Sequence, residues 1–154
     1  MSLILKKLPL ELEANTAGYS FIELEGNIGV IANGAGLTMA TLDALTLHKG
    51  RPRNFLDLGG TDNVEIVANA FNFVLKANPK AILVNIFGGV TKCDTVATGI
   101  VEAKRRYQIK QPTVVRLSGV REEEGRKILT EAGIDSFPGM MMAIERVVKL
   151  AGGN

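Results

Sequence analysis

The sequence has very few of the residues on which most self-contained catalytic sites depend. Its 154 residues include one cysteine, one histidine and no tryptophan. A single cysteine excludes a disulfide within the chain, and one histidine without a cysteine cluster leaves too few ligands for an ordinary zinc site. A Ser-His-Asp triad could use only His48. We therefore expect no metal site and no catalytic residue supplied by this chain.

Long apolar runs and blocks of like charge are also missing. No apolar run reaches the ~18 residues that a membrane-spanning helix needs. The 18 basic and 16 acidic residues leave a net charge of +2, and the nearest approach to a charge block is Glu122–Glu124. This charge pattern gives no footprint for nucleic acid or a membrane surface. We expect a cytoplasmic protein with neither as a partner.

Glycine, by contrast, is abundant and regularly placed. Five short apolar runs are each followed by glycine, and the segments between them carry helical periodicity. This alternation is typical of βαβ units in a parallel sheet whose strands are buried on both faces. The strands are expected over 28–33, 55–58, 82–87, 114–117 and 134–137. The helices are expected over 37–49, 63–76, 93–107, 121–132 and 140–150.

The residues before the first of these strands are assigned separately. Weak alternation over 20–24 predicts an additional edge strand. Residues 1–18 show no comparable pattern and are interpreted as a leader or linker remnant rather than a fold element. The domain proper is therefore placed at 19–151.

Two glycine-rich loops mark the expected binding site. Five parallel strands commonly take the order 2-1-3-4-5, and ligands bind where that order reverses, between strands 1 and 3. The loops Asn33–Gly36 and Gly88–Asp94 should meet there. Each runs into a helix, and helix N-termini offer free N–H groups and a positive dipole end. The sequence thus predicts an anion-binding crevice.

Several side chains near this crevice have two readings. Thr91 and Asp94 have the spacing of a capping box, and a ligand role for them is equally open. Lys92 either adds charge to the site or is simply solvated. Cys93 is expected to serve packing rather than catalysis, although a helix N-terminus can lower a thiol pKa.

Three other features are weighed against the site. The segment 34–39 begins like a dinucleotide fingerprint, with Asp57 about 20 residues on, but Met39 replaces the third glycine. His48 falls at the far end of its helix and is interpreted as a surface or capping residue. Arg116 lies inside a strand and is expected to pair with an internal carboxylate, with a substrate as the alternative.

Taken in order, these motifs resemble the C-terminal domain of the succinyl-CoA synthetase β subunit. The resemblance covers residues from about 14 to 150. It is carried by Gly26–Gly29, Asn33–Leu37, Asn54–Gly60, Leu83–Gly89 with Cys93–Asp94, and Val115–Leu117 with Gly119 and Gly125.

The resemblance implies a flavodoxin-like domain, a three-layer αβα sandwich, of a nucleotide-dependent acid-CoA ligase. In that family a phosphate from ATP or GTP passes through a histidine of the α subunit to succinate, and CoA attacks the resulting succinyl phosphate. By position, Asn33, Gly89, Val90 and Thr91 would contact the organic acid. Gly88, Lys92, Cys93 and Asp94 would form the helix N-terminus that faces the phosphohistidine loop.

The same resemblance indicates which cofactors and partner domains the complete enzyme would require. Nucleotide and magnesium would bind in an upstream ATP-grasp domain and CoA on the α subunit, so this domain is expected to bind no cofactor alone and to be inactive when isolated. Val90-Thr91-Lys92 departs from the family's aliphatic pair followed by arginine, which leaves the acid open among succinate, acetate, malate and citrate. A stand-alone nucleotide or flavin module and an assembly surface are the alternatives.

Overall fold

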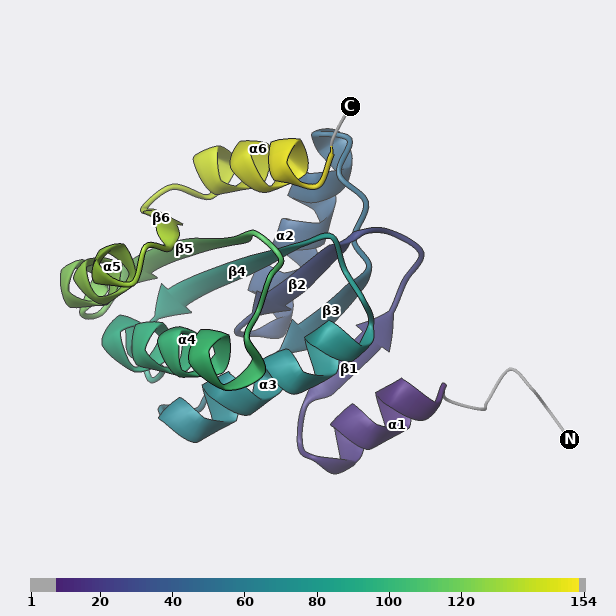
Figure 1. Cartoon of the computed structure of the whole chain (residues 1–154), viewed down its shortest axis with the longest axis horizontal. Helices are drawn as coiled ribbons and strands as arrows, with labels where there is room; N and C mark the ends of the chain where they lie inside the picture. The colour runs from purple at the N-terminus through teal and green to yellow at the C-terminus, as the bar shows by residue number, and fades with distance from the viewer. Residues whose placement is uncertain (1–7, 153–154) are drawn as a thin grey trace, which may run out of the picture.

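A six-stranded sheet with helices on both faces organises residues 8–152, the part of the chain that the computed structural model describes (Figure 1). The strands are β1 (Ser20–Glu23), β2 (Ile28–Ala32), β3 (Asn54–Asp57), β4 (Ala81–Gly88), β5 (Thr113–Gly119) and β6 (Asp135–Phe137). The helices are α1 (Pro9–Thr16), α2 (Ala35–Leu47), α3 (Val64–Lys76), α4 (Cys93–Tyr107), α5 (Glu122–Glu131) and α6 (Met140–Leu150).

The strand order is β1-β3-β2-β4-β5-β6. Strand β1 pairs antiparallel with β3, with Ser20 opposite Asp57, and every other pair is parallel. Counted without β1, the five parallel strands therefore follow the predicted order 2-1-3-4-5. The edge strand expected over 20–24 is confirmed as β1. The flavodoxin-like αβα class is confirmed as well.

Two hydrophobic cores fill the space between the sheet and its helices. Helices α2 and α6 pack on one face, against Ile28, Val30 and Leu83. Helices α3, α4 and α5 cover the opposite face, where Ile31 and Val84 lie. Neighbouring strand residues thus enter different cores, because side chains alternate across a strand. This two-sided burial explains why the strands read as continuous apolar runs.

The stretch before β1 contains a helix that the sequence pattern did not predict. Residues 9–16 form α1, and Ala14 is completely buried in the larger core. The hydroxyl of Tyr19, just beyond the helix, donates to the Ile66 carbonyl at 2.6 Å. The sequence pattern did not reveal this helix because its apolar residues do not form one buried stripe. Leu12, for example, is 57% exposed. Tertiary contacts with α3 and β1 stabilise it, so the assignment of 1–18 as a non-folded remnant is wrong over α1.

Helices α3 and α4 approach so closely that one glycine has no room for a side chain. A Cβ added at Gly99 would lie 2.6 Å from Cβ of Val67 and 3.0 Å from the Val64 carbonyl. Overpacking costs about 1–3 kcal/mol, while Gly to Ala in a helix gains at most about 1 kcal/mol. Gly99→Ala should therefore lower the free energy of unfolding by roughly 1–2 kcal/mol in urea denaturation.

Gly36→Ala is the matched control for that prediction. A Cβ at Gly36, in the first turn of α2, would meet no atom within 4 Å. The same substitution there should leave stability unchanged or raise it by up to about 1 kcal/mol. Equal effects at the two positions would contradict the assigned role of helix packing.

Candidate functional site

The candidate site lies at the carboxyl ends of β2 and β4, where the strand order reverses. β3 pairs with one side of β2 and β4 with the other, so the connections leaving β2 and β4 go to opposite faces. The β2–α2 loop contains Asn33 and Gly34, and the β4–α4 loop contains residues 89–92. The structure thus brings together the two loops that the sequence pattern selected.

Asn33 joins these two strand ends directly. Its side-chain Nδ2 donates to the Phe87 carbonyl at 3.1 Å, and its Oδ1 accepts from the Phe87 N–H at 3.1 Å. The regular pairing of β2 with β4 ends one residue earlier, at Ala32 and Asn85. Asn33 therefore extends the ladder through a side chain and holds the end of β2 against the end of β4.

Helix α2 presents free backbone donors to this crevice. Gly34, its N-cap, has φ +97°, a conformation that side chains rarely adopt, and it directs its N–H to Oδ1 of Asp57 at 2.8 Å. The next three amides have no acceptor among residues 8–152, as expected for the first turn of a helix. Ala35 and Gly36 are exposed. The start of α2 can therefore donate several hydrogen bonds to an anion.

The start of α4 is more nearly satisfied within the chain. Lys92 is the N-cap, and its N–H donates to Oδ1 of Asp62 at 3.0 Å while its ammonium group lies 3.3 Å from Oδ2. These contacts hold the pKa of Asp62 below its usual value. The Cys93 N–H donates to the Val120 carbonyl at 3.0 Å. The two helix starts therefore differ in how many donors they can offer a ligand.

Of the two interpretations left open for Thr91 and Asp94, the capping box is wrong. Thr91 precedes the N-cap by one residue, is buried, and its hydroxyl donates to the Thr61 carbonyl. Asp94 accepts from the neighbouring Thr95 N–H at 3.0 Å and pairs with Arg121 at 2.7 Å. The helix begins one residue later than the Thr-x-x-Asp spacing requires, because Asp62 already occupies the N-cap N–H. Thr91 can offer a ligand its backbone only.

The β3–α3 loop (residues 58–63) and the strand residue before it link both helix starts, a feature that sequence analysis missed. Asp57 takes the N–H of Gly34 and also that of Gly59 at 2.8 Å. Asp62 takes the N–H of Lys92, as described above. The sequence signal for this link is the pair Asp57 and Asp62 on either side of Gly59-Gly60. Sequence analysis considered Asp57 only as part of a dinucleotide fingerprint and did not consider Asp62.

Gly88 and Cys93 lie beneath the loops rather than at the surface of the crevice. A Cβ at Gly88 would lie 2.9 Å from the Cys93 sulfur, and one at Gly119 would lie 2.4 Å from the Gly88 carbonyl oxygen. Cys93 is completely buried, and its thiol donates to the Ser118 carbonyl at 3.4 Å. Burial raises the pKa of this thiol. The predicted packing role for Cys93 fits this environment.

Three exposed apolar side chains lie in or beside the loops that follow β4 and β5. Phe87 is 57% exposed and Val90 is 73% exposed, while Val120 contributes from the β5–α5 loop at 45%. Large apolar side chains at this level of exposure, clustered around polar loops, are typical of surfaces that bind another molecule. Val90 was predicted as a site residue. Phe87 and Val120 were not singled out, although Phe87 directly precedes the Gly-Gly pair.

Among residues 8–152, Arg116 does not have the internal carboxylate partner that was expected. Its Nε donates to the Pro138 carbonyl at 3.1 Å and its NH1 to Oδ1 of Asn85 at 3.2 Å. The guanidinium also lies 5.9 Å from the centre of the Phe87 ring. Burial lowers the pKa of Arg116. Two neutral oxygens and the Phe87 ring therefore take the place of the predicted carboxylate partner of Arg116. The Asn85 side chain in turn donates to the Thr41 hydroxyl at 2.8 Å.

His48 takes no part in the site. It is the C-cap of α2, at the opposite end of that helix from Gly34, as the sequence pattern predicted. Within residues 8–152, no group of three His, Cys, Asp or Glu side chains is placed to hold a metal ion. None of the helices described there is long and apolar enough to cross a membrane.

A doubly wound α/β domain with two loop-to-helix junctions at its switch point is thus the class that fold and site define. The CoA-ligase family matches residues 31–147, and the chain belongs to that family. Two curated relatives are β subunits of succinate-CoA ligase (ADP-forming). The protein of Ignicoccus hospitalis is 52% identical over 92% of this chain, and that of Desulfurococcus amylolyticus is 49% identical over 94%. The chain spans 38% of either relative's length.

Solved structures share the fold at low sequence identity. A crystal structure from Pyrococcus horikoshii OT3 superposes with a TM-score of 0.69 at 15% identity, over 82% of this chain and 36% of that one. The dinucleotide-forming acetyl-coenzyme A synthetase 1 of Ca. Korarchaeum cryptofilum, in complex with phosphate and ADP, gives 0.66 at 20% identity, over 86% and 35%. These likenesses concern the fold alone.

The raised pKa of Cys93 makes its reactivity testable. A buried thiol with a raised pKa carries less thiolate at pH 8, so native protein should react with a disulfide reagent at least tenfold more slowly than unfolded protein. The pKa of Cys93 is higher in the folded than in the unfolded protein, so its titration makes the free energy of unfolding depend on pH. The contribution of the protonated thiol to stability is fully present below the unfolded pKa of ~8.5 and is lost as pH rises through the folded pKa. Equal rates in buffer and in guanidinium would contradict the assignment.

Proposed function

We propose that this chain forms the acid-binding, phosphohistidine-facing domain of the β subunit of a nucleotide-dependent succinate-CoA ligase. The observation that carries the proposal is the exposed first turn of α2, with three unsatisfied amides beside Asn33 at the switch point. Support comes from the names of the relatives, which are succinate-CoA ligase β subunits. An α-type partner would complete the enzyme.

In this proposal the organic acid lies between the two loops. Gly89 would line the position of the acid, but its N–H already donates to the Thr91 carbonyl at 3.0 Å. The Val90 N–H and the remaining Nδ2 hydrogen of Asn33 would orient one carboxylate, and the first turn of α2 would offset its charge. The positive end of α4, with Lys92 and Asp94 at its start, would face the loop that carries the phosphorylated histidine. Phosphoryl transfer depends chiefly on positioning and charge stabilisation, which backbone donors of this kind can supply.

The resemblance to succinyl-CoA synthetase β subunits implies a division of labour. The chain would bind and orient the acid, while nucleotide and magnesium would bind in an ATP-grasp part of the complete β subunit, and CoA on the α partner. A small acid held mainly by backbone donors leaves succinate, acetate, malate and citrate as possible substrates. The relatives' names favour succinate with ADP.

A chimaera tests the proposal. Residues 14–150 would replace the matching segment of the Ignicoccus hospitalis β subunit, which would be assembled with its α subunit and assayed for succinate- and ATP-dependent formation of succinyl-CoA. We expect activity within about tenfold of the parent enzyme. Assembly without activity for any of the four acids would overturn the proposal, and so would tight binding of NAD or FMN by the isolated chain.

Bulk at Gly89 should abolish that activity without unfolding the domain. A Cβ at Gly89 would meet no atom within 4 Å, so the side chain of Gly89→Val would project into the open crevice. We expect kcat/KM for the acid to fall at least 100-fold while the complex still assembles in size-exclusion chromatography. Gly139→Val is the control, because Gly139 is equally open but starts α6. Full activity of Gly89→Val would refute the placement of the acid.

Asp57 should act as a positioning residue for the start of α2. Asp57→Ala removes the acceptor of the Gly34 and Gly59 amides and should raise KM for the acid roughly tenfold, the equivalent of one lost hydrogen bond to a charged group. Asp57→Asn retains Oδ1 and should restore KM to within about twofold. A merely structural role would instead lower the melting temperature of both variants and leave KM of the folded enzyme unchanged.

A further inference from the structure

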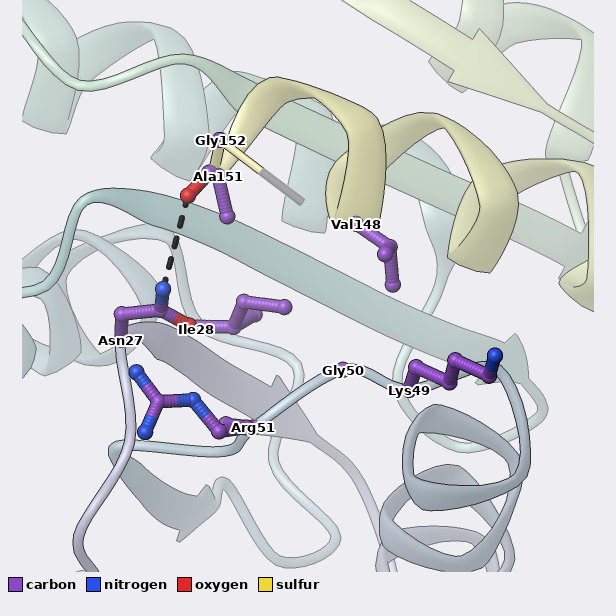
Figure 2. A pocket seen from close by; sticks show the side chains of 8 residues that line it. All are labelled: Asn27, Ile28, Lys49, Gly50, Arg51, Val148, Ala151 and Gly152. Atoms are coloured by element: carbon purple, nitrogen blue, oxygen red, sulfur yellow. Dashed lines mark hydrogen bonds between the residues drawn. The ribbon is translucent and has the colours of Figure 1, made fainter. Parts of the chain in front are cut away.

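Arg116 is the one half-buried arginine of residues 8–152 that has no carboxylate partner there. Six of the eight arginines pair with a carboxylate at distances between 2.6 and 3.2 Å. The other exception, Arg51, is exposed at the opposite end of the sheet, and Figure 2 shows its guanidinium pointing away from the Lys49 ammonium group. Water can solvate an exposed cation, whereas a partly buried one depends on a partner. Arg116 therefore lacks the counter-charge that its position calls for.

The guanidinium of Arg116 is held in place but not saturated. Its Nε and Nη1 donate to the Pro138 carbonyl and to Oδ1 of Asn85, and the Phe87 ring packs beside it at 5.9 Å. Within residues 8–152, its Nη2 has no hydrogen bond, and no buried side-chain nitrogen or oxygen lacks a partner, so Nη2 lies at the surface. A guanidinium carries five N–H donors. Several of them remain for an acceptor from another molecule.

The surroundings of Arg116 leave its positive charge uncompensated. The carboxylate whose charge acts on it is Glu122, but that group pairs with Arg126 at 3.0 Å. Pro138, the carbonyl partner, directly precedes Gly139, the N-cap of α6, which has no side-chain cap. The N-terminal end of a helix is itself positive and favours an anion over a cation. A bound carboxylate would relieve both the unpaired guanidinium and the start of α6.

Buried hydrogen bonds connect Arg116 to the first turn of α2, where the candidate site offers free amides. The Asn85 side chain accepts from Arg116 at 3.2 Å and donates to the Thr41 hydroxyl at 2.8 Å. That hydroxyl in turn donates to the Leu37 carbonyl, in the first turn of α2, at 2.6 Å. Asn85 and Thr41 are completely buried. Three successive hydrogen bonds thus fix the guanidinium relative to the free amides, on the same face of the sheet.

We propose that Arg116 binds the second carboxylate of a dicarboxylic acid whose first carboxylate lies at Asn33 and the first turn of α2. The inference rests on the proposed function and narrows its substrate class to acids with at least two carboxylates, which excludes acetate. The planar guanidinium suits a carboxylate, and a monocarboxylic acid would leave it unpaired. The competing explanation is that Arg116 only joins β4, β5 and the start of α6.

The active chimaera described above distinguishes these explanations. KM and kcat for succinate would be measured together with the inhibition constant of butyrate, a competing acid of the same chain length with one carboxylate. Arg116→Gln should raise KM for succinate by about tenfold or more, change kcat by less than about threefold, and leave the inhibition constant of butyrate within about twofold. A purely structural role would instead change both constants alike, or lower the melting temperature and leave KM unchanged.

Two further variants complete the test. Arg116→Lys keeps the charge without the planar fork and should give an intermediate KM, which also decides the question if Arg116→Gln does not fold. Arg126→Gln is the matched control, because Arg126 is also half-buried and donates to the Leu117 carbonyl at 2.8 Å but has Glu122 as its partner. Its KM for succinate should stay within about twofold of the parent.

The failures of the two proposals are distinguishable. An active parent whose Arg116 variants keep the parental KM, or change the constants for succinate and butyrate alike, would overturn this inference alone. Loss of assembly with the α subunit in both Arg116 variants would assign the residue to subunit contact and would also overturn it. An inactive parent chimaera would overturn the proposed function and this inference with it.

Discussion

Parallel pairing of β2 with β4 is the constraint on which the remaining structure depends. Once Ala32 lies opposite Asn85, β3 must add on the far side of β2, and the helices that follow β2 and β4 must cover opposite faces. The loops after β2 and β4 then leave toward opposite faces, which makes this the topological switch point where open α/β sheets bind ligands. Asn33 joins the two strand ends there by bonding the Phe87 backbone in both directions. Fold and candidate site therefore have one origin.

The two helix starts at this crevice are unequal, and the difference comes from a few acceptors. Asp62, the Val120 carbonyl and the Asp94 side chain take three amides at the start of α4. Only the N-cap amide of α2 is similarly occupied, by Asp57. Carboxylates near both helix starts also reduce the local positive potential. In the proposed function, an anion would be recognised by directed N–H groups more than by net charge, which would suit a transient ligand that must leave after reaction.

The strands and long helices were predictable from the sequence because their signals are local and consistent. Buried runs ending in glycine gave the parallel strands, and glycine-bounded periodic segments gave α2 to α6. Helix α1 was not predictable, since tertiary contacts through Tyr19 and Ala14 stabilise it. The capping box failed because a distant residue, Asp62, fixes where α4 begins. The partner of Arg116 was missed because Asn85 is 31 positions away and neutral. Side-chain pairing across strands is not encoded in local spacing.

The contact between Gly88 and Gly119 also has an evolutionary consequence. A Cβ at Gly119 would lie 2.4 Å from the Gly88 carbonyl oxygen, and a Cβ at Gly88 would lie 3.0 Å from the Val120 backbone, so neither position can take a side chain without a shift of the neighbouring backbone. If the proposed function holds, variation in substrate preference would fall at the tips of the loops, where Gly89 and Val90 face open space. Homologues that act on different acids should diverge there while keeping the same pair of strand ends.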